Sequence, residues 1–342
     1  MDVVIVTGSC GRIGSNVVRK LGDQYRIVGF ELLKAIYASP AEELVPVDLS
    51  SDESVHQAFT HIRATYGNRI ASVIHLAAYY SFDQQHSPLY ETVTVQGTER
   101  LLKALQTFEV DQFIFSSTML VHAPCQPGHP INENSPVEPK WDYPLSKVHT
   151  EKAIHDLRGK ISTVILRIAG VYDDHCHSIP ISHQIQRIYE RQLEAHLFSG
   201  NVDHGASFLH MADLIDAIAI AVKKRKELPP ELTLLVGESK TLSYADLQCQ
   251  ISCLLRNRPI RTFRVPKLVA KIGAWVQGLF GKSFIKPWMI DLADDHYELD
   301  ISRAKKTLGW VPKHNLADTL PIMIAELKSA PEAWYKLNGL KK

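Results

Sequence analysis

The first 170 residues alternate short apolar segments with segments of helical periodicity, and this alternation restricts the fold more than any other feature. The apolar run Val3–Thr7 has no polar alternation, as expected for a strand buried on both faces of a parallel sheet. Further strands are expected at residues 25–30, 44–47, 70–76, 112–115 and 162–167, and helices at 13–21, 53–66, 89–107 and 144–157. Repeated βαβ units of this kind predict an α/β fold with a doubly wound parallel sheet.

A glycine turn joins the first apolar segment to the first helix. The turn contains Gly8, Cys10, Gly11, Arg12, Ile13 and Gly14. Glycines let the backbone approach a pyrophosphate closely, and the helix N-terminus offers N–H groups without helical partners. Because the turn lies at the first strand–helix junction, we expect it to bind the phosphates of a dinucleotide.

Acidic residues end the second and third expected strands. Glu31 is placed to accept hydrogen bonds from the adenosine ribose and to repel a 2′-phosphate, which favours NAD over NADP. Arg12 and Lys34 are the cations that would oppose this preference. Asp48, followed by Leu49, is placed to reach the adenine amine; its alternative role is to cap the next helix.

A tyrosine and a lysine four residues apart, Tyr143 and Lys147, predict a proton-transfer site. On a helix the two side chains project from one face. A nearby ammonium lowers the pKa of a phenol, which is about 10 when unperturbed. Pro144 suits the first helical position, so we expect Tyr143 in or just before the first turn, where the helix dipole also favours negative charge. By itself, this spacing is also found in exposed helical pairs.

The composition argues against several other kinds of protein. Lys plus Arg total 38 against 37 Asp plus Glu, a balance that is not typical of a nucleic-acid binder. No uncharged apolar run is long enough to span a bilayer and no leader pattern follows Met1, so we expect a cytoplasmic protein. The five scattered cysteines do not suggest a disulfide framework. Residues 174–177 (Asp-His-Cys-His) lack a second ligand pair, so no metal site is expected.

The second half is less regular, and we expect it to contribute to two lobes. A strand at 208–210, a helix at 212–224 and a strand at 233–236 are interpreted as returns to the sheet. Residues 1–170, with returns near 206–236, are therefore assigned to the nucleotide-binding domain. Residues 171–205 and 237–342 are assigned to a smaller substrate lobe. No Gly/Ser linker separates the two, so we expect them to be interleaved over one cleft.

With these elements in order, the chain resembles the extended short-chain dehydrogenase/reductase family, also called NAD-dependent epimerase/dehydratases. Further matching elements, in order, are His75-Leu76-Ala77-Ala78, Gly97-Thr98-Glu99-Arg100-Leu101-Leu102, Phe115-Ser116-Ser117-Thr118, Leu166-Arg167, Val171-Tyr172, Phe208-x-His210-x-x-Asp213, Asp300-x-Ser302-Arg303-Ala304 and Leu308-Gly309-Trp310-x-Pro312. The match covers almost the whole chain. The resemblance implies a Rossmann sheet, an NAD(P) cofactor, and frequently a homodimer built from two helices per subunit.

The resemblance also implies roles for individual residues. Tyr143 would be the general acid/base on the substrate hydroxyl or carbonyl, and Lys147 would lower its pKa and hydrogen-bond the nicotinamide ribose. Thr118 would hold the substrate oxygen, a role that Ser116 or Ser117 could share. By strand alternation, Ser116 and Thr118 face one side and Ser117 the other. The implied cofactor contacts also include Leu76, Ala77, Ala78 and Ser116.

Departures from the family pattern narrow the reaction. Met119 and Leu120 follow Thr118 where 4,6-dehydratases carry an acidic pair, so dehydration lacks its acid and base. Sugar-nucleotide epimerases hold phosphate with an asparagine and an arginine at the places of Gly170 and Ala206. A UDP-sugar 4-epimerase therefore stays as an alternative that needs another cation. The candidates for that cation are Arg187, Arg191, Arg261 and Arg264.

A late segment carries apolar residues on one helical face, with lysines on its flanks. The apolar positions are Leu268, Val269, Ile272, Val276, Leu279 and Phe280. We expect this helix to pack on the smaller lobe. The alternatives are a lid over an apolar substrate and a contact with a membrane surface. Together with Gly170-Val171-Tyr172, the segment resembles the 3β-hydroxysteroid dehydrogenase-like branch.

Together these features predict an NAD-dependent oxidoreductase acting at a secondary alcohol or ketone, or an epimerase working by oxidation, rotation and re-reduction. The expected partner is a small-molecule substrate, either an apolar alcohol or ketone or a nucleotide sugar. An alternative of another class is a regulator that binds NAD(H) without turnover.

Overall fold

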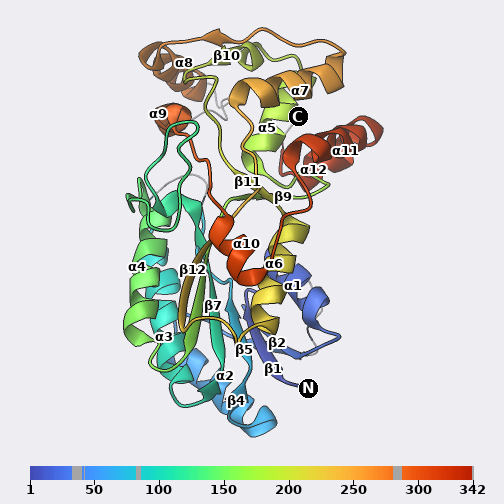
Figure 1. The fold of residues 1–342 in the computed structure, drawn as a ribbon. Coiled ribbons are helices and arrows are strands. Elements are labelled where there is room, and N and C mark those ends of the chain that lie inside the picture. Colours follow the sequence, from blue (N-terminus) through green and yellow to red (C-terminus); the bar gives the residue numbers. More distant parts are fainter. Residues whose placement is uncertain (33–40, 42, 82–85, 280–286, 341–342) are drawn as a thin grey trace.

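A computed structural model describes residues 1–32, 41, 43–81, 86–279 and 287–340, and it shows two parts along the long axis of the molecule (Figure 1). A sheet with helices on both faces forms one part, and helices with short strands form the smaller one. Lys34 and Phe280, both named in the predictions from sequence, lie outside the described residues.

Seven parallel strands form the sheet, in the order β12-β8-β7-β5-β1-β2-β3. Their bounds are β1 Val3–Thr7, β2 Arg26–Glu31, β3 Glu43–Pro46, β5 Ser72–His75, β7 Gln112–Thr118, β8 Ser162–Ile168 and β12 Glu231–Val236. The strand order changes direction between β1 and β5, and ligands of such sheets bind at the carboxyl ends of the strands beside this point. The predicted doubly wound α/β fold is confirmed.

Both faces of the sheet are covered by helices and buried, which explains why its strands read as continuous apolar runs. One face packs against α1 (Arg12–Leu21), α6 (Met211–Lys223) and α10 (Ser302–Leu308). The other face packs against α2 (Asp52–Tyr66), α3 (Gln96–Leu105) and α4 (Asp142–Leu157).

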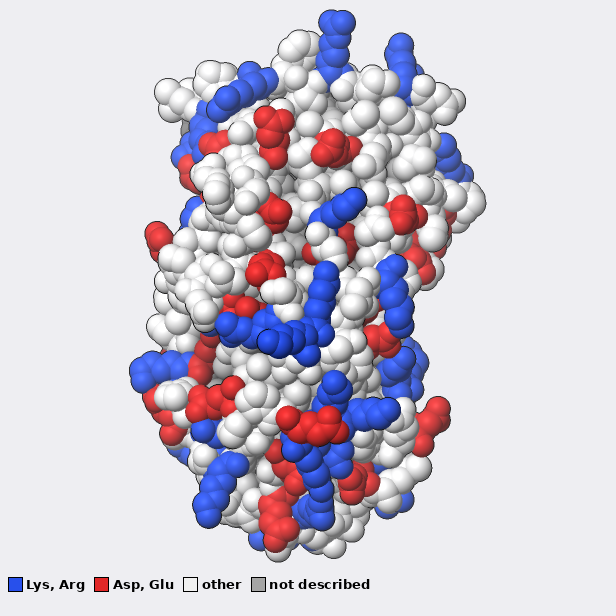
Figure 2. Space-filling model, in the orientation of Figure 1, with Lys and Arg blue, Asp and Glu red and all other residues white. Residues whose placement is uncertain are grey.

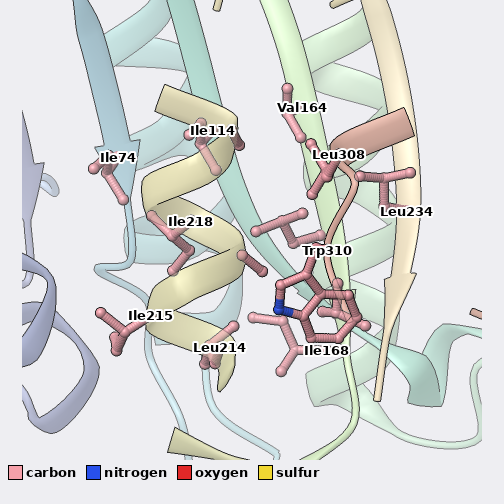
Figure 3. Packing of buried hydrophobic residues seen from close by; sticks show 14 of the residues in the cluster. Ile74, Ile114, Val164, Ile168, Leu214, Ile215, Ile218, Leu234, Leu308 and Trp310 are labelled. Atoms are coloured by element: carbon pink, nitrogen blue, oxygen red, sulfur yellow. The ribbon is translucent and has the colours of Figure 1, made fainter. Parts of the chain in front are cut away.

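Trp310 fills the space between the sheet and α6, beside Ile168 and Leu214 (Figure 3). Its ring is 2% exposed, and its indole nitrogen donates to the Asp213 carbonyl at 2.9 Å. Residues 297–310, assigned from sequence to the smaller lobe, contribute six side chains to this core: Tyr297, Leu299, Ile301, Ala304, Leu308 and Trp310.

The helix expected at 89–107 is confirmed, and it begins as a π-helix, η1 (Tyr90–Val95), before it continues as α3. Arg100 donates to the Thr92 carbonyl at 3.3 Å and so gives this wider turn an extra donor. Pro144 is the third residue of α4 rather than the first, because Trp141 is the N-cap. Tyr143 lies in the first turn, as expected.

One strand prediction was also wrong. β11 (Phe208–His210) does not return to the main sheet; it pairs in parallel with β9 (Gly170–Tyr172) in a separate two-stranded sheet. β12 does return to the main sheet, beside β8. Two further short pairs join β4 (Arg69–Ile70) to β6 (Glu109–Val110) and β10 (Leu197–Phe198) to β13 (Phe263–Arg264).

The smaller part has its own apolar core. Its helices are α5 (Ile179–Tyr189), α7 (Tyr244–Arg256), α8 (Lys267–Leu279), α9 (Pro287–Asp291), α11 (Leu316–Ser329) and α12 (Pro331–Leu337), and its 3₁₀ turns are η3 (Leu193–His196) and η4 (Leu292–Asp294). α5, α7, α11 and α12 bury a cluster that includes Ile181, Ile185, Ile251, Leu320, Met323 and Trp334.

The apolar face of α8 is not packed as expected. Leu268, Val269 and Ile272 are all more than half exposed, so the prediction that these residues pack on the smaller lobe was wrong; Trp275 is exposed as well. The structure does not describe the side chains of Val276 and Leu279. Among the helices that the structure describes, none is long and apolar enough to cross a membrane.

Candidate active site

The glycine turn has the geometry of a phosphate cradle. Gly8 has a φ of +70°, and its N–H donates to the Phe30 carbonyl at 2.9 Å. A Cβ on Gly14 would lie 2.1 Å from the Gly8 carbonyl oxygen, so only glycine fits there. Gly11 is the N-cap of α1 and supplies no side-chain cap, which leaves the first N–H groups of that helix for an anion. The turn therefore fits a pyrophosphate.

A cavity of about 170 Å³ lies beside this turn. It is lined by Arg12, Ile13, Val171, Tyr172, His177 and Met211. Arg12 donates to the His177 carbonyl at 3.1 Å, so the N-terminus of α1 contacts the loop that follows β9. Arg12 and Ile13, two of the turn residues predicted to contact the cofactor, thus lie where the sheet meets the smaller part.

Glu31 lies at the rim of the glycine turn, as its position at the end of β2 predicted. Its two carboxylate oxygens accept from the N–H groups of Cys10, at 3.1 Å, and Leu32, at 2.9 Å. These bonds fix the carboxylate beside the turn and leave further lone pairs for ribose hydroxyls. Cys10, also predicted at the turn, is buried.

Asp48 is held in a local turn before α2. One carboxylate oxygen accepts from both the N–H and the hydroxyl of Ser50, at 2.9 and 2.6 Å. The N-cap of α2 is Ser51, so Asp48 stabilises the turn and is not itself the cap. Leu49, the next predicted cofactor residue, is buried under Gly97, where a Cβ would lie 2.9 Å from the Leu49 Cβ.

A buried chain of hydrogen bonds joins the ends of β1 and β5. Thr7 Oγ1 accepts from the N–H groups of Leu76 and Ala77, each at 3.1 Å, and contacts His75 Nδ1 at 2.7 Å. His75 Nε2 contacts Thr98 Oγ1 at 2.8 Å. Because Thr98 donates to a helical carbonyl, His75 must donate through Nε2 and accept at Nδ1.

This chain positions the loop at 76–78, which was predicted to contact the cofactor. It holds Ala77 against Gly8, where a Cβ would lie only 3.1 Å from the Ala77 nitrogen. Burial, and then the charge of Lys147, lowers the pKa of His75 to about 3, so the imidazole is neutral at physiological pH. Neither the contact of Thr98 nor the function of Thr7 and His75 was predicted from the sequence. The sequence did contain one indication of this function, because Thr7 and His75 are polar residues that end adjacent apolar strands.

The three predicted catalytic residues lie together at the carboxyl end of the sheet. Thr118 ends β7, and Tyr143 and Lys147 lie one turn apart on α4. A hydrogen bond joins the Thr118 and Tyr143 side chains. The Lys147 ammonium lies 5.8 Å from the centre of the Tyr143 ring and donates to the Ser116 carbonyl at 2.7 Å.

The pKa values of this pair differ from the sequence-based expectation. Burial raises the pKa of Tyr143, as does Tyr80, while the hydrogen bond with Thr118 lowers it. The lowering expected from Lys147 is not found, and burial is the largest cause of the shift. Burial also lowers the pKa of Lys147 to about 7, against the opposing charge of Glu151. Tyr143 is thus a protonated phenol at neutral pH beside an ammonium near its own midpoint.

Two neighbours complete the site. Tyr80, which the sequence did not single out, sets its ring edge-on to Tyr143 with the centroids 4.9 Å apart. The strand alternation is as predicted: the Ser116 hydroxyl donates to the His75 carbonyl at 3.2 Å, whereas the Ser117 hydroxyl donates to Glu151 at 2.5 Å.

The structure gives physical reasons for the departures noted in the sequence. Met119 is buried in η2 (Met119–Val121), where it packs in the core. A Cβ on Gly170 would lie 2.9 Å from the Phe208 ring, so the asparagine expected of sugar-nucleotide epimerases would require that ring to move. Among the described residues, no group of three or more His, Cys, Asp or Glu side chains is arranged to hold a metal ion.

Of the four candidate replacement cations, one lies inside the smaller part. Arg187, on α5, hydrogen-bonds Tyr244, and burial lowers the pKa of its guanidinium. Its charge, after burial, helps to lower the pKa of His183 to about 4. Arg191, Arg261 and Arg264 are exposed and so are not enclosed in the same way.

Comparison with known proteins identifies the family of the chain. The model of the NAD dependent epimerase/dehydratase family matches residues 4–237, which include the glycine turn, Thr118, Tyr143 and Lys147. The chain belongs to this family. Members are enzymes of the extended short-chain dehydrogenase/reductase type, and NAD is the cofactor. Membership of this family of enzymes argues against the alternative of a non-catalytic NAD(H)-binding regulator.

Two relatives each match more than nine tenths of the chain and are named for different reactions. Human 3 beta-hydroxysteroid dehydrogenase type 7 is 26% identical over 357 aligned residues, covering 93% of each chain. The UDP-glucose 4-epimerase of Vibrio cholerae is also 26% identical, over 327 aligned residues and 92% of each chain. Sequence identity alone does not decide between the two activities.

Solved structures confirm the fold over nearly the whole chain. UDP-glucose 4-epimerase from Thermotoga maritima, determined with UDP-glucose, aligns with a TM-score of 0.73 and 20% identity, covering 96% of this chain and 99% of that one. The enzyme of the same name from Thermus thermophilus, in complex with NAD, aligns with a TM-score of 0.71 and the same identity and coverage.

Proposed function

We propose that Thr118, Tyr143 and Lys147 catalyse NAD-dependent hydride transfer at a secondary alcohol or ketone. The observation that carries the proposal is their convergence: a hydrogen-bonded Thr118–Tyr143 pair with the Lys147 ammonium behind it, at the carboxyl ends of the strands. The phosphate cradle lies at the end of β1, near the point where the strand order reverses.

Each side chain has a separable part in the reaction. NAD, when bound, accepts or supplies the hydride. Tyr143 donates its proton to the carbonyl oxygen during reduction and takes it from the hydroxyl during oxidation. Thr118 holds the same oxygen and stabilises the charge that develops on it. Because burial raises the pKa of Tyr143, oxidation is expected to accelerate as the pH rises above neutrality.

The test is Tyr143→Phe, with Tyr80→Phe as the matched control on the adjoining ring. Removing the acid/base hydroxyl should lower kcat by roughly 10²–10⁴-fold while NAD affinity, measured by calorimetry, stays within a few-fold. Tyr80→Phe keeps the edge-on contact and should retain most of the rate. Undiminished turnover by Tyr143→Phe would show that the proposed mechanism is wrong.

We propose that residues 171–205 and 237–342 supply the substrate pocket, and that the substrate is an apolar alcohol or ketone. Gly170 and Ala206 stand where nucleotide-sugar epimerases bind phosphate, and a larger side chain at residue 170 would displace the Phe208 ring. These two positions support the reaction named for the human relative over the reaction named for the Vibrio cholerae one.

A nucleotide-sugar 4-epimerase is the second candidate, and the enclosed Arg187 is the observation that favours it. A cation within the smaller part, beside Tyr244, can pair with a diphosphate. Calorimetry with UDP-glucose separates the two candidates. Binding that is lost in Arg187→Met but kept in the exposed control Arg191→Met would support the epimerase; no binding to wild type would support the apolar substrate.

We further propose a cytoplasmic homodimer. None of the five cysteines, all of which lie in the described part of the chain, forms a disulfide, and such thiols suit a reducing compartment. The dimer is the family arrangement of two helices per subunit. Light scattering coupled to size-exclusion chromatography gives the mass directly, and a monomeric mass at micromolar concentration would contradict the dimer.

A further inference from the structure

A long stretch of the smaller part has a charge composition unlike the rest of the chain. Residues 247–290 contain no Asp or Glu but eight Lys and Arg, although cations and acids are balanced at 38 to 37 over the whole chain. The stretch runs from α7 through β13 and α8 to the first half of α9. A segment with cations alone is attractive to an anionic partner.

The same stretch exposes large apolar side chains. Phe263, Leu268, Val269, Ile272 and Trp275 are between 56% and 71% exposed. Leu268, Ile272 and Trp275 follow one another at intervals of four and three residues, so they form one stripe along α8. A row of exposed apolar residues that includes a tryptophan marks an interaction surface rather than the scatter normal for a soluble protein.

The lysine side of α8 is attached to the body of the protein. Lys267 pairs with Asp294 at 2.7 Å, and Lys271 pairs with Asp291 at 2.5 Å. These bonds hold the helix on α9 and η4. The apolar stripe is therefore exposed on a helix that is anchored to the protein.

Exposed arginines lie in the segment that joins α7 to α8. Arg258, Arg261 and Arg264 are exposed, and the last of these is in β13 next to Phe263. Arg191, Arg256 and Arg258 border a shallow hollow of about 520 Å³, where burial and then the charges of Arg191 and Arg258 lower the pKa of Arg256. Figure 1 places α8 and β10 at the end of the molecule farthest from the sheet, and Lys and Arg side chains project there in Figure 2.

We propose that this lobe-end surface, made of Phe263, Leu268, Val269, Ile272, Trp275, Arg258, Arg261 and Arg264, binds the surface of an anionic lipid bilayer. The apolar stripe enters the boundary between headgroups and acyl chains, and the arginines contact the anionic headgroups. The protein lies on the membrane and does not cross it.

The combination of charge and apolar exposure favours a bilayer over other occupants. A second copy meeting this surface with its own would bring arginines against arginines, which is repulsive. A free phosphate compound would pair with the arginines but leave the stripe from Leu268 to Trp275 in water. An anionic bilayer satisfies both sets of side chains at once.

The test is sedimentation of the full chain with vesicles. Vesicles of phosphatidylcholine with phosphatidylglycerol should bind the wild type, and vesicles of phosphatidylcholine alone should bind it much less. Ile272→Asp and the double variant Arg261→Gln/Arg264→Gln should each lower the partition coefficient by roughly tenfold or more. Brominated acyl chains should quench wild-type fluorescence, and Trp275→Phe should lose that quenching.

Matched controls lie elsewhere on the surface. Ile322→Asp introduces the same charge at a 52% exposed position of α11, and Lys160→Gln/Lys240→Gln removes two exposed cations. Both controls should bind vesicles like the wild type. All variants should retain the wild-type melting temperature to within a few degrees, because the altered side chains are exposed.

Three outcomes would overturn the proposal. The first is no sedimentation of wild type with anionic vesicles. The second is binding abolished by inorganic phosphate but not by chloride at equal ionic strength, which would indicate an anion site only. The third is a change of oligomeric mass in Ile272→Asp without any vesicle binding by the wild type, which would assign the surface to a second copy.

Discussion

Tryptophan side chains are buried beside the sheet but exposed at the end of the smaller part. Trp310 is 2% exposed between the sheet and α6, whereas Trp275 is 63% exposed on α8. In the sheet, polar groups at the strand ends are held by buried hydrogen bonds, whereas α8 is held by ion pairs near the surface. Packing therefore fixes the side chains of the cofactor-binding half. At the end of the smaller part, α8 keeps apolar side chains that are not needed for packing.

Replacing the two tryptophans tests this contrast most strongly. Trp310→Ala removes a fully buried ring and the bond to the Asp213 carbonyl, and should lower the free energy of unfolding by about 3–5 kcal/mol. Trp275→Ala should change it by less than about 0.5 kcal/mol. Urea titration followed by circular dichroism measures both. Equal losses would mean that α8 is packed after all.

Two helical glycines give the next largest contrast. Gly14→Ala places a Cβ 2.1 Å from the Gly8 carbonyl oxygen, and the backbone must move to accept it. NAD affinity should fall by roughly a hundredfold, or about 2.7 kcal/mol. Gly273→Ala, on α8, meets no described atom within 4 Å and should leave NAD affinity unchanged, as measured by calorimetry. Normal NAD binding by Gly14→Ala would remove the turn from the cofactor site.

The buried histidine should make the sheet sensitive to acid. Burial lowers the folded-state pKa of His75 to about 3, so the unfolded chain binds a proton more readily below about pH 6.5. Its contribution is present above that pH and is lost as the pH falls towards 3. Between pH 6.5 and 5 the loss should be about 2 kcal/mol.

His75→Gln should show a smaller loss over that interval than the wild type, by urea titration at the two pH values. His129→Gln, at an exposed position, should match the wild type. The same acid dependence in all three proteins would assign the effect to other groups.

The smallest effect is expected where α8 is held. Lys271→Gln removes the bond to Asp291, and because both side chains are partly exposed to water the cost should be below about 1 kcal/mol. That cost should shrink at high salt, since the wild-type pair is screened. Differential scanning calorimetry at two salt concentrations measures it. A loss as large as that of Trp310→Ala would contradict the contrast between the two regions.

The site positions predicted well from the sequence are those that follow from the geometry of a parallel sheet. Glu31 and Thr118 each end a strand, and the carboxyl ends of parallel strands meet at one edge of the sheet. The place of the glycine turn before α1 and the four-residue spacing of Tyr143 and Lys147 are local features, readable without tertiary contacts. The family resemblance added the roles of these residues, and the match over residues 4–237 confirms the family.

The features that the sequence did not predict depend on contacts between distant segments or on opposing contributions to a pKa. Thr98 reaches His75 only because α3 packs on the sheet, and Tyr80 reaches Tyr143 across a gap of 63 positions. The pKa of Tyr143 depends on whether burial or charge dominates, which spacing does not reveal. The exposed stripe of α8 was mispredicted because amphipathic periodicity does not say what covers the apolar face.

The path of the chain between the two parts has a consequence for how such enzymes can change over evolution. After β9 the chain enters the smaller part, returns for α6 and β12, leaves again, and comes back at Trp310 before ending in α12. The smaller part is therefore a set of insertions into one sheet-forming chain. Recombination cannot exchange it as a single gene segment, but each insertion can lengthen, shorten or drift alone, so new substrates can arise without rebuilding the cofactor site.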